Sequence, residues 1–148
     1  RAYALLADFF AQTARMMGMD TNAPYAAMEG LLKSADRPED VPTVLPLFEG
    51  TRQDSMQTGS ITGLTAENFT PLHLIYGMMD GMAHELHQMY QAYRAAGGTA
   101  KKLIGSGGGL RNNRFLCESF SRVFDSTIIL SDGREEAACG AALYAADR

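Results

Sequence analysis

The sequence predicts a single α/β domain in which parallel strands are covered by helices. Between residues 101 and 146, short runs of β-forming residues alternate with helical runs, as they do where helices connect parallel strands. Upstream, three segments carry apolar residues at three- and four-residue steps, the pattern of helices packed on one side. With 148 residues, 46% of them apolar, the chain can bury a core without disulfides or a structural metal.

Two helices are predicted near the start of the chain. Residues 3–17 place apolar side chains at helical spacing. The second helix begins after Asn22, with Asn22 or Ala23 as its cap. Pro24 takes its first position, where a backbone N–H has no partner within the helix in any case, and the helix continues to residue 35.

The region that follows is predicted to be mostly turns and extended chain. Residues 44–48 form a short β-type run, and Pro46 within it restricts the run to an edge strand or an extended loop. A polar segment then runs to Thr65. It is rich in turn-forming residues, including glycines that can take positive φ.

The longest helix is predicted from Pro71 to residue 96, with Thr70 as its cap. Its apolar stripe has helical spacing throughout and is interpreted as a face buried in the core rather than as a groove for a partner. The stripe consists of Ile75, Met78, Met79, Met82, Leu86, Met89, Tyr90 and Tyr93.

The last part of the chain is predicted to alternate between strands and helices. Strands are expected at residues 101–105 and 126–130, and helices at residues 112–123 and 135–146. The segment SGGGLR, between the first of these strands and the first of these helices, is predicted to be a loop. Because the elements alternate within a compact segment, the two strands are expected to lie in one parallel layer.

Charge and cysteine content exclude several classes of partner. The chain has 13 basic and 17 acidic residues, a net charge of −4, and only Lys101 and Lys102 stand together, which argues against a nucleic-acid partner. No apolar run approaches the roughly twenty residues that cross a bilayer, so no membrane partner is expected. Cys117 and Cys139 form no CxxC pair and have no His at ligand spacing, which fits small core residues in a reducing, cytoplasmic compartment.

The segment GSGGGLRNN, residues 105–113, is the strongest candidate for a ligand site. Its glycines let a ligand lie directly against the backbone between a strand and a helix. Counted from Gly105 or from Gly107, it lacks the third glycine of a GxGxxG loop, and it has no Lys to bind a triphosphate. Asn112 and Asn113 offer amide groups that suit a purine edge or a ribose. A tight strand-to-helix turn with an Asn cap is the alternative interpretation.

Other residues that could take part in binding or catalysis form weaker patterns. Glu135 and Glu136 stand at a predicted helix start, where carboxylates stabilise the helix dipole, and the small side chains after them permit close packing. His84 and His87 lack an obvious third ligand and the HExxH spacing, so no metal ligand is assigned. No nucleophile with its base can be argued from these positions, and no catalytic residue is assigned.

Taken in order, several segments resemble the C-terminal domain of FGGY-family carbohydrate kinases. They are PLFEGTR (46–52), GSITGLT (59–65), the long helix opening at Pro71, LIGSGGGLRNN (103–113) and DGREEAACGAALYAA (132–146). The match runs from about Val41 to the end of the sequence, and among members it is nearest to sedoheptulokinase-like enzymes. Thr51 departs from the family pattern, which usually has Glu there.

The resemblance implies an actin-like, ribonuclease H-like ATPase lobe, with a central sheet flanked by helices, that forms one wall of an ATP cleft. Residues 1–148 would then be a single C-terminal lobe of a longer two-lobed kinase. In such kinases a glycine-rich loop followed by Asn holds the adenosine, which here places Asn112 toward the adenine. The residues that this assigns to the nucleotide are Gly107, Gly108, Gly109, Asn112 and Asn113.

The activity that the resemblance implies is ATP-dependent phosphorylation of a sugar hydroxyl, on a ketose such as sedoheptulose or xylulose or on a related polyol. The family's acceptor-activating Asp and its DxGT-type phosphate loop lie upstream of the matched region. The chain alone is therefore expected to be inactive, with ATP and Mg²⁺ shared with a missing N-terminal lobe. The oligomeric state stays open, a homodimer included.

Two functions of other classes stay open. One is a non-catalytic actin-like module for oligomerisation or partner binding, which the Met-rich stripe and the incomplete catalytic set favour. The other is a Rossmann-type oxidoreductase domain, which would use Asp132 after the second strand to bind a ribose. The failed GxGxxG count disfavours this second alternative.

Overall fold

The computed structural model describes residues 1–19, 22–52, 54–131, 133, 138 and 145. Of the predicted helix at residues 135–146, only residues 138 and 145 are described. Asp132 and Cys139 lie outside the described residues. In chain order the elements are α1 (Ala2–Met16), α2 (Pro24–Ser34), β1 (Thr43–Leu45), β2 (Ser60–Thr62), α3 (Pro71–Ala95), β3 (Leu103–Gly105), α4 (Gly108–Asn112), α5 (Arg114–Val123) and β4 (Ile128–Leu130).

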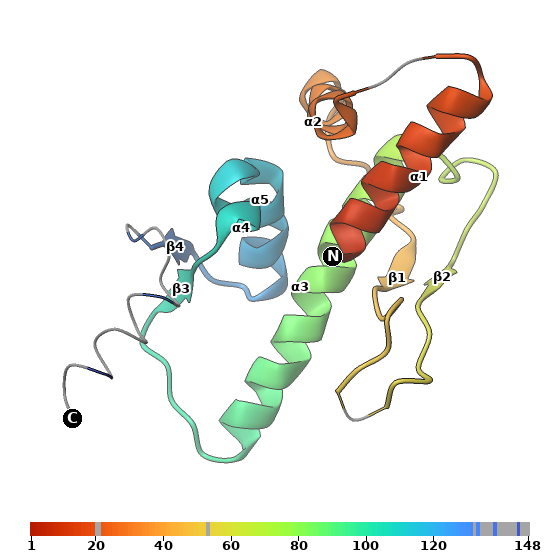
Figure 1. Ribbon diagram of the computed structural model, residues 1–148. Coiled ribbons are helices and arrows are strands. Elements are labelled where there is room, and N and C mark those ends of the chain that lie inside the picture. The colour runs from red at the N-terminus through yellow and green to blue at the C-terminus, as the bar shows by residue number, and fades with distance from the viewer. Residues whose placement is uncertain (20–21, 53, 132, 134–137, 139–144, 146–148) are drawn as a thin grey trace.

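The long helix α3 is the scaffold of the fold, with α1, α2 and β1 packed along it and α5 against another of its faces (Figure 1). Thr70 has extended backbone, and its side chain accepts a hydrogen bond from the backbone N–H of His73, so it caps the helix as predicted. Pro71 lies in the first turn. The start of α2 is also confirmed, with Ala23 as cap and Pro24 in the first turn.

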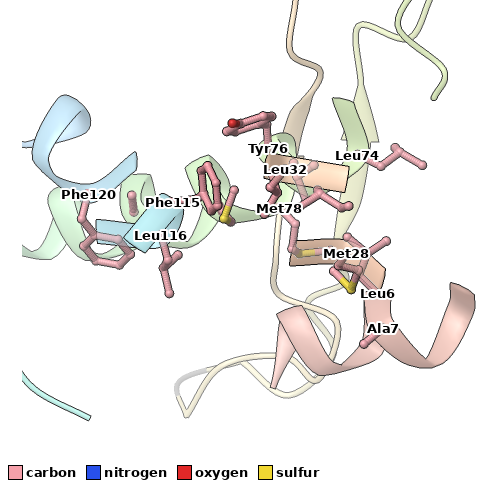
Figure 2. Packing of buried hydrophobic residues seen from close by; sticks show 14 residues of the cluster. Leu6, Ala7, Met28, Leu32, Leu74, Tyr76, Met78, Phe115, Leu116 and Phe120 are labelled. Carbon is pink, nitrogen blue, oxygen red and sulfur yellow. The ribbon is translucent and has the colours of Figure 1, made fainter. Parts of the chain in front are cut away.

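The core lies around the first half of α3. Figure 2 shows the α5 side chains Phe115 and Phe120 on one side of this cluster and the α1 side chain Leu6 on the other. Apolar side chains brought together from distant parts of the chain supply the main stabilisation of such a core. The buried cluster consists of Leu6, Ala7, Met28, Leu32, Val44, Leu74, Ile75, Tyr76, Met78, Met79, Ala83, Phe115, Leu116 and Phe120.

The predicted apolar stripe of α3 is buried only in its first half. Ile75 and Met79 are completely buried, whereas Leu86, Met89 and Tyr93 are 49%, 65% and 50% exposed. The helix continues beyond the elements that cover its first turns, so the same spacing of apolar residues passes from the core to the surface. The interpretation of the whole stripe as a buried face is therefore wrong for Leu86, Met89 and Tyr93, whereas Tyr90 is half-buried against Phe124.

The first small sheet is the antiparallel pair of β1 and β2, in which Val44 stands opposite Ile61. The edge-strand prediction is confirmed for β1, which ends just before Pro46, because proline has no N–H for the ladder. The strand β2 lies in the segment predicted to be turns. All its residues are exposed, so its sequence lacks the alternation that marks a half-buried strand.

The second small sheet is the parallel pair of β3 and β4, in which Ile104 stands opposite Ile129. The parallel arrangement predicted from the strand and helix alternation is confirmed. Among the described residues, the strands form these two separate pairs, and no ladder joins β1 to β3. Gly105 permits tight packing at the end of β3, since a Cβ there would stand 2.7 Å from Cγ2 of Ile128.

Two glycines let α3 cross β1 at close range. A Cβ on Gly77 would stand 2.8 Å from the carbonyl oxygen of Pro42, and a Cβ on Gly81 would overlap the carbonyl oxygen of Val44. These neighbours are backbone atoms, which cannot turn aside as the end of a flexible side chain can. The position of β1 along α3 therefore depends on the missing side chains of Gly77 and Gly81.

The loop predicted after β3 is partly helical. Gly107, at a φ of 93°, starts the short helix α4, and Asn113 then leaves the helical conformation at φ −134° before α5 begins at Arg114. The helix predicted from residue 112 therefore starts two residues later. The break has a local cause, because the side chain of Asn113 accepts a hydrogen bond from the backbone N–H of Leu116 at 3.1 Å and so caps α5.

An ion-pair cluster joins three segments around α3. Asp80 is mostly buried and is bonded by both terminal nitrogens of Arg37, which follows α2, and by Arg122 of α5. The guanidinium of Arg37 also lies 4.8 Å from the ring centre of Tyr76. Two guanidinium groups on one carboxylate fix the segment after α2 and the end of α5 to the same turn of α3.

Candidate functional site

A cavity of about 560 Å³ opens where the starts of α1 and α2 approach α4 and α5. Its lining includes Gly108, Gly109, Asn112 and Asn113, which are residues of the segment that the sequence marks as a ligand site. The volume lies within the usual range of small-molecule sites. The structure thus brings these residues to one concave surface, whereas Gly107 stands just before them, at the start of α4.

Gly108 and Gly109 form a part of the cavity wall that has no side chains. Outside the backbone of α4, the described atoms within 4 Å would be the amide nitrogen of Asn112, at 3.8 Å from a Cβ on Gly108, and Cδ2 of Leu116, at 3.7 Å from a Cβ on Gly109. Neither position has the positive φ that favours glycine. The fold therefore does not require glycine at these two positions, and their bare backbone leaves room in the cavity.

Gly107 differs from the two glycines that follow it. Its φ of 93° lies in the region that side chains rarely adopt, and in the described part of the chain no atom beyond its sequence neighbours lies within 4 Å of a Cβ built there. Glycine at this position is explained by the conformation of the turn into α4. Its predicted contact with a nucleotide stays a prediction.

The two asparagines have different surroundings. Asn113 is half-buried, and its amide nitrogen lies 3.4 Å from the Tyr3 hydroxyl while its oxygen caps α5. Asn112 is exposed, lines the cavity and makes no side-chain hydrogen bond to any residue that the structure describes. The Asn-cap interpretation is therefore correct for Asn113, and the Asn112 amide is the one left available to a ligand.

An aromatic pair forms another part of the wall. Tyr3 of α1 and Tyr25 of α2 stack with their ring centres 6.2 Å apart and their planes at 24°, and both line the cavity. Burial raises the pKa of the Tyr3 hydroxyl, and the hydrogen bond from Asn113 opposes this shift. The hydroxyl is therefore protonated at neutral pH and can donate a hydrogen bond to a ligand.

Charged side chains lie at the rim of the cavity and already have partners. Arg1 forms an ion pair with Glu49, at 2.5 Å, and Glu29 forms one with Lys33 one helical turn later. Both pairs are exposed, so each contributes little to stability. The cavity therefore presents aromatic and amide groups to a ligand, with balanced charge at its rim.

The wall that α1 and α2 supply could not be predicted from the sequence. Tyr3 and Asn113 are 110 positions apart, and α1 and α2 carry no ligand motif. The one local signal was the helical spacing of residues 3–17, which predicts that α1 packs on one side but does not show what it packs against.

Several residues considered from the sequence lie away from this cavity. Nε2 of His87 bonds Nε2 of Gln91 at 2.9 Å, and His84 lines another cavity, with β1. Within the described residues no three His, Cys, Asp or Glu side chains lie close enough to share a metal ion. Thr51 holds a turn, because its hydroxyl accepts from the backbone N–H of Asp54. Glu136, like its neighbour at 135, lies outside the described residues.

Two further observations concern the cysteine and membrane predictions. Cys117 is half-buried, its Sγ lies 3.0 Å from the Leu110 carbonyl oxygen, and burial raises the pKa of its thiol, so the thiolate is disfavoured. None of the helices in the described part of the chain has both the length and the apolar character of a membrane span.

The fold and the cavity define an α/β lobe with a glycine-lined site beside an exposed asparagine amide. The chain matches the C-terminal domain of the FGGY family of carbohydrate kinases over residues 4–147, and it belongs to this family. The family predicted from the order of the sequence segments is thereby confirmed.

Individual relatives agree with this assignment. The chain is 28% identical to a xylulose kinase of Bacillus subtilis (strain 168) over 132 residues, which cover 85% of this chain and 26% of that protein. Its fold is similar to that of xylulose kinase from Rhodospirillum rubrum, with a TM-score of 0.71, 23% identity, and coverage of 87% of this chain and 25% of the other. For Plasmodium falciparum glycerol kinase with ADP the TM-score is 0.63, at 19% identity, with coverage of 93% and 27%.

These likenesses confirm the predicted fold class, the actin-like ATPase fold of the sugar kinases. The chain spans about a quarter of the length of the relatives that it matches.

Proposed function

We propose that this chain is the adenosine-binding lobe of an ATP-dependent carbohydrate kinase. The observation that carries the proposal is that Gly108, Gly109, Asn112 and Asn113 line one cavity of about 560 Å³. Membership of the FGGY family supports the class of reaction, because it is a family of carbohydrate kinases. The substrate class is a sugar or a related polyol, with ketoses such as xylulose and sedoheptulose as candidates.

The composition of the cavity suits the base and ribose of the nucleotide better than its phosphates. Its uncharged polar groups include the Asn112 amide, which can donate to and accept from a purine edge, and the Tyr3 hydroxyl. Among the described residues that line it there is no lysine, and the arginine there, Arg1, is paired with Glu49. Gly108 and Gly109 have no side chain of their own that would hold a ring away from their backbone.

The phosphates, Mg²⁺ and the catalytic base belong to another part of the kinase in this proposal. The described residues supply no cluster of carboxylates that could hold a cation. Phosphoryl transfer depends on positioning and electrostatic stabilisation by such groups, so we expect the isolated 148-residue chain to have no turnover. Assays of ATP consumption with xylulose, sedoheptulose and glycerol test this, and sugar-dependent consumption by the isolated chain would contradict it.

The two asparagines provide a paired test of the nucleotide site. Asn112→Ala is expected to weaken ADP binding about tenfold, the loss of one or two hydrogen bonds, with an unchanged melting temperature. Asn113→Ala removes the cap of α5 and is expected to lower stability by about 1 kcal/mol. Calorimetric titration with ADP and thermal unfolding measure both effects.

The wild-type titration also decides the proposal as a whole. Absence of ADP binding by the wild-type protein would contradict the proposed function. Equal ADP affinity of the wild type and the Asn112→Ala variant would exclude Asn112 from the site. Thermal unfolding of both variants serves as the control, because it separates a binding effect from a folding effect.

A non-catalytic module is the second candidate function, and the exposed half of α3 favours it. Leu86, Met89 and Tyr93 each leave about half or more of the side chain exposed, as residues that a second copy or a partner would cover can do. An oligomerisation module would show concentration-dependent sedimentation that Leu86→Lys abolishes, without ADP binding. The homodimer and the cytoplasmic location both stay predictions.

A further inference from the structure

An aromatic pair stands in the cavity that the proposed function assigns to adenosine. Tyr3 comes from α1 and Tyr25 from α2, and their rings stack with centres 6.2 Å apart. Both line the same cavity as Gly108, Gly109 and Asn112. A flat π-surface, a bare backbone and a free amide group therefore share one concave surface.

Tyr25 is not a core residue. Its side chain leaves 54% of its surface exposed, and its ring is not part of the buried cluster around α3. The ring packs against Tyr3, and the exposed part of the side chain is open to a ligand. The cavity side of α2 thus carries an exposed aromatic ring at the site where a planar group would enter.

Tyr3 holds this ring in place. Its hydroxyl lies 3.4 Å from the amide nitrogen of Asn113, whose oxygen caps α5 through the backbone N–H of Leu116. The orientation of Tyr3 is therefore coupled to the junction of α4 and α5. Because Tyr25 stacks on Tyr3, the aromatic surface has a fixed relation to the glycine wall.

We propose that Tyr25, supported by Tyr3 as a positioning residue, is the surface on which the nucleobase stacks. This inference rests on the proposed function and adds a determinant of base selection to it. Stacking on an aromatic side chain strengthens with the area of the base, so a two-ring purine gains more than a one-ring pyrimidine. The site selects purine over pyrimidine nucleotides through Tyr25.

Calorimetric titration of the purified protein with ADP and with CDP tests the proposal. Tyr25→Ala is expected to weaken ADP binding about tenfold and to reduce the preference for ADP over CDP. Tyr25→Phe keeps the ring and is expected to bind ADP within about twofold of the wild type. Phe9→Ala is the matched control, because Phe9 is 53% exposed and is not among the residues that line the cavity.

The outcomes separate this inference from the proposed function. If the wild type binds ADP and Tyr25→Ala binds it equally well, the stacking role is overturned and the proposed function stands. The same conclusion follows if Tyr25→Ala weakens ADP and CDP binding by the same factor. If the wild type binds neither nucleotide, the proposed function fails and this inference fails with it. Thermal unfolding establishes that each variant is folded.

Discussion

The Gly108→Val variant is expected to lose ADP affinity by a factor on the order of a hundred while its fold is preserved. A Cβ at this position would meet only the Asn112 amide nitrogen, at 3.8 Å, and the backbone has no positive φ that a side chain would strain. Valine is therefore accommodated by the fold. Its methyl groups would occupy the cavity space that the ligand needs.

Calorimetry with ADP and thermal unfolding measure the two sides of this prediction. Gly30→Ala is the control for binding, because Gly30 lies in α2 with no atom within 4 Å of a Cβ and does not line the cavity. Unchanged ADP affinity in folded Gly108→Val would show that nucleotides do not bind against this glycine. A lost fold would show that the packing around Gly108 is tighter than the structure indicates.

The Gly81→Ala variant is expected to show the largest loss of stability, about 3 kcal/mol, which lowers the melting temperature by about 6 to 12 °C. The added methyl group would overlap the carbonyl oxygen of Val44 and stand 3.1 Å from its carbonyl carbon. Relief of this overlap requires β1 to move away from α3. Val44 is itself buried in the core, so the movement also opens apolar packing.

Gly30→Ala again provides the comparison, now for stability. The change to alanine removes a flexible residue from the interior of a helix without a new contact, so a gain of about 0.5 to 1 kcal/mol is expected. Differential scanning calorimetry of the two variants measures the contrast. A melting temperature of Gly81→Ala equal to that of the wild type would contradict the close crossing of α3 and β1.

Local sequence signals predicted the helix starts and the parallel pair well. Thr70 with Pro71 and Ala23 with Pro24 are both short-range signals, since the cap and the first turn involve neighbours in the chain. The parallel pairing of β3 with β4 followed from the alternation of strand and helix. These features depend on sequence order and spacing, which the sequence displays directly.

Features that depend on neighbours in space could not be predicted in the same way. The stripe of α3 keeps its spacing through Leu86 and Met89, yet these side chains are 49% and 65% exposed. The strand β2 carries no burial pattern, because pairing with β1 alone leaves it exposed. The break at Asn113 depends on a side-chain cap that competes with continuation of the helix.

The residues of the candidate site fall into the same two groups, those near one another in the sequence and those brought together only by the fold. Gly108, Gly109 and Asn112 belong to one short segment, so their proximity was readable from the sequence. Tyr3 and Tyr25 join them only through the packing of α1 and α2, and no motif in either helix signals this contact. The sequence therefore indicated the glycine wall of the cavity. The structure was needed to show the aromatic wall, which comes from a distant part of the sequence.

Hydrogen exchange of the protein with and without ADP tests the central claim most directly. Binding at the proposed site is expected to slow exchange in peptides that cover residues 105–116 and 22–29, and to leave residues 84–98 at the surface end of α3 unchanged. Protection confined to residues 84–98, or no protection at residues 105–116 at saturating ADP, would contradict the adenosine-binding role of this lobe.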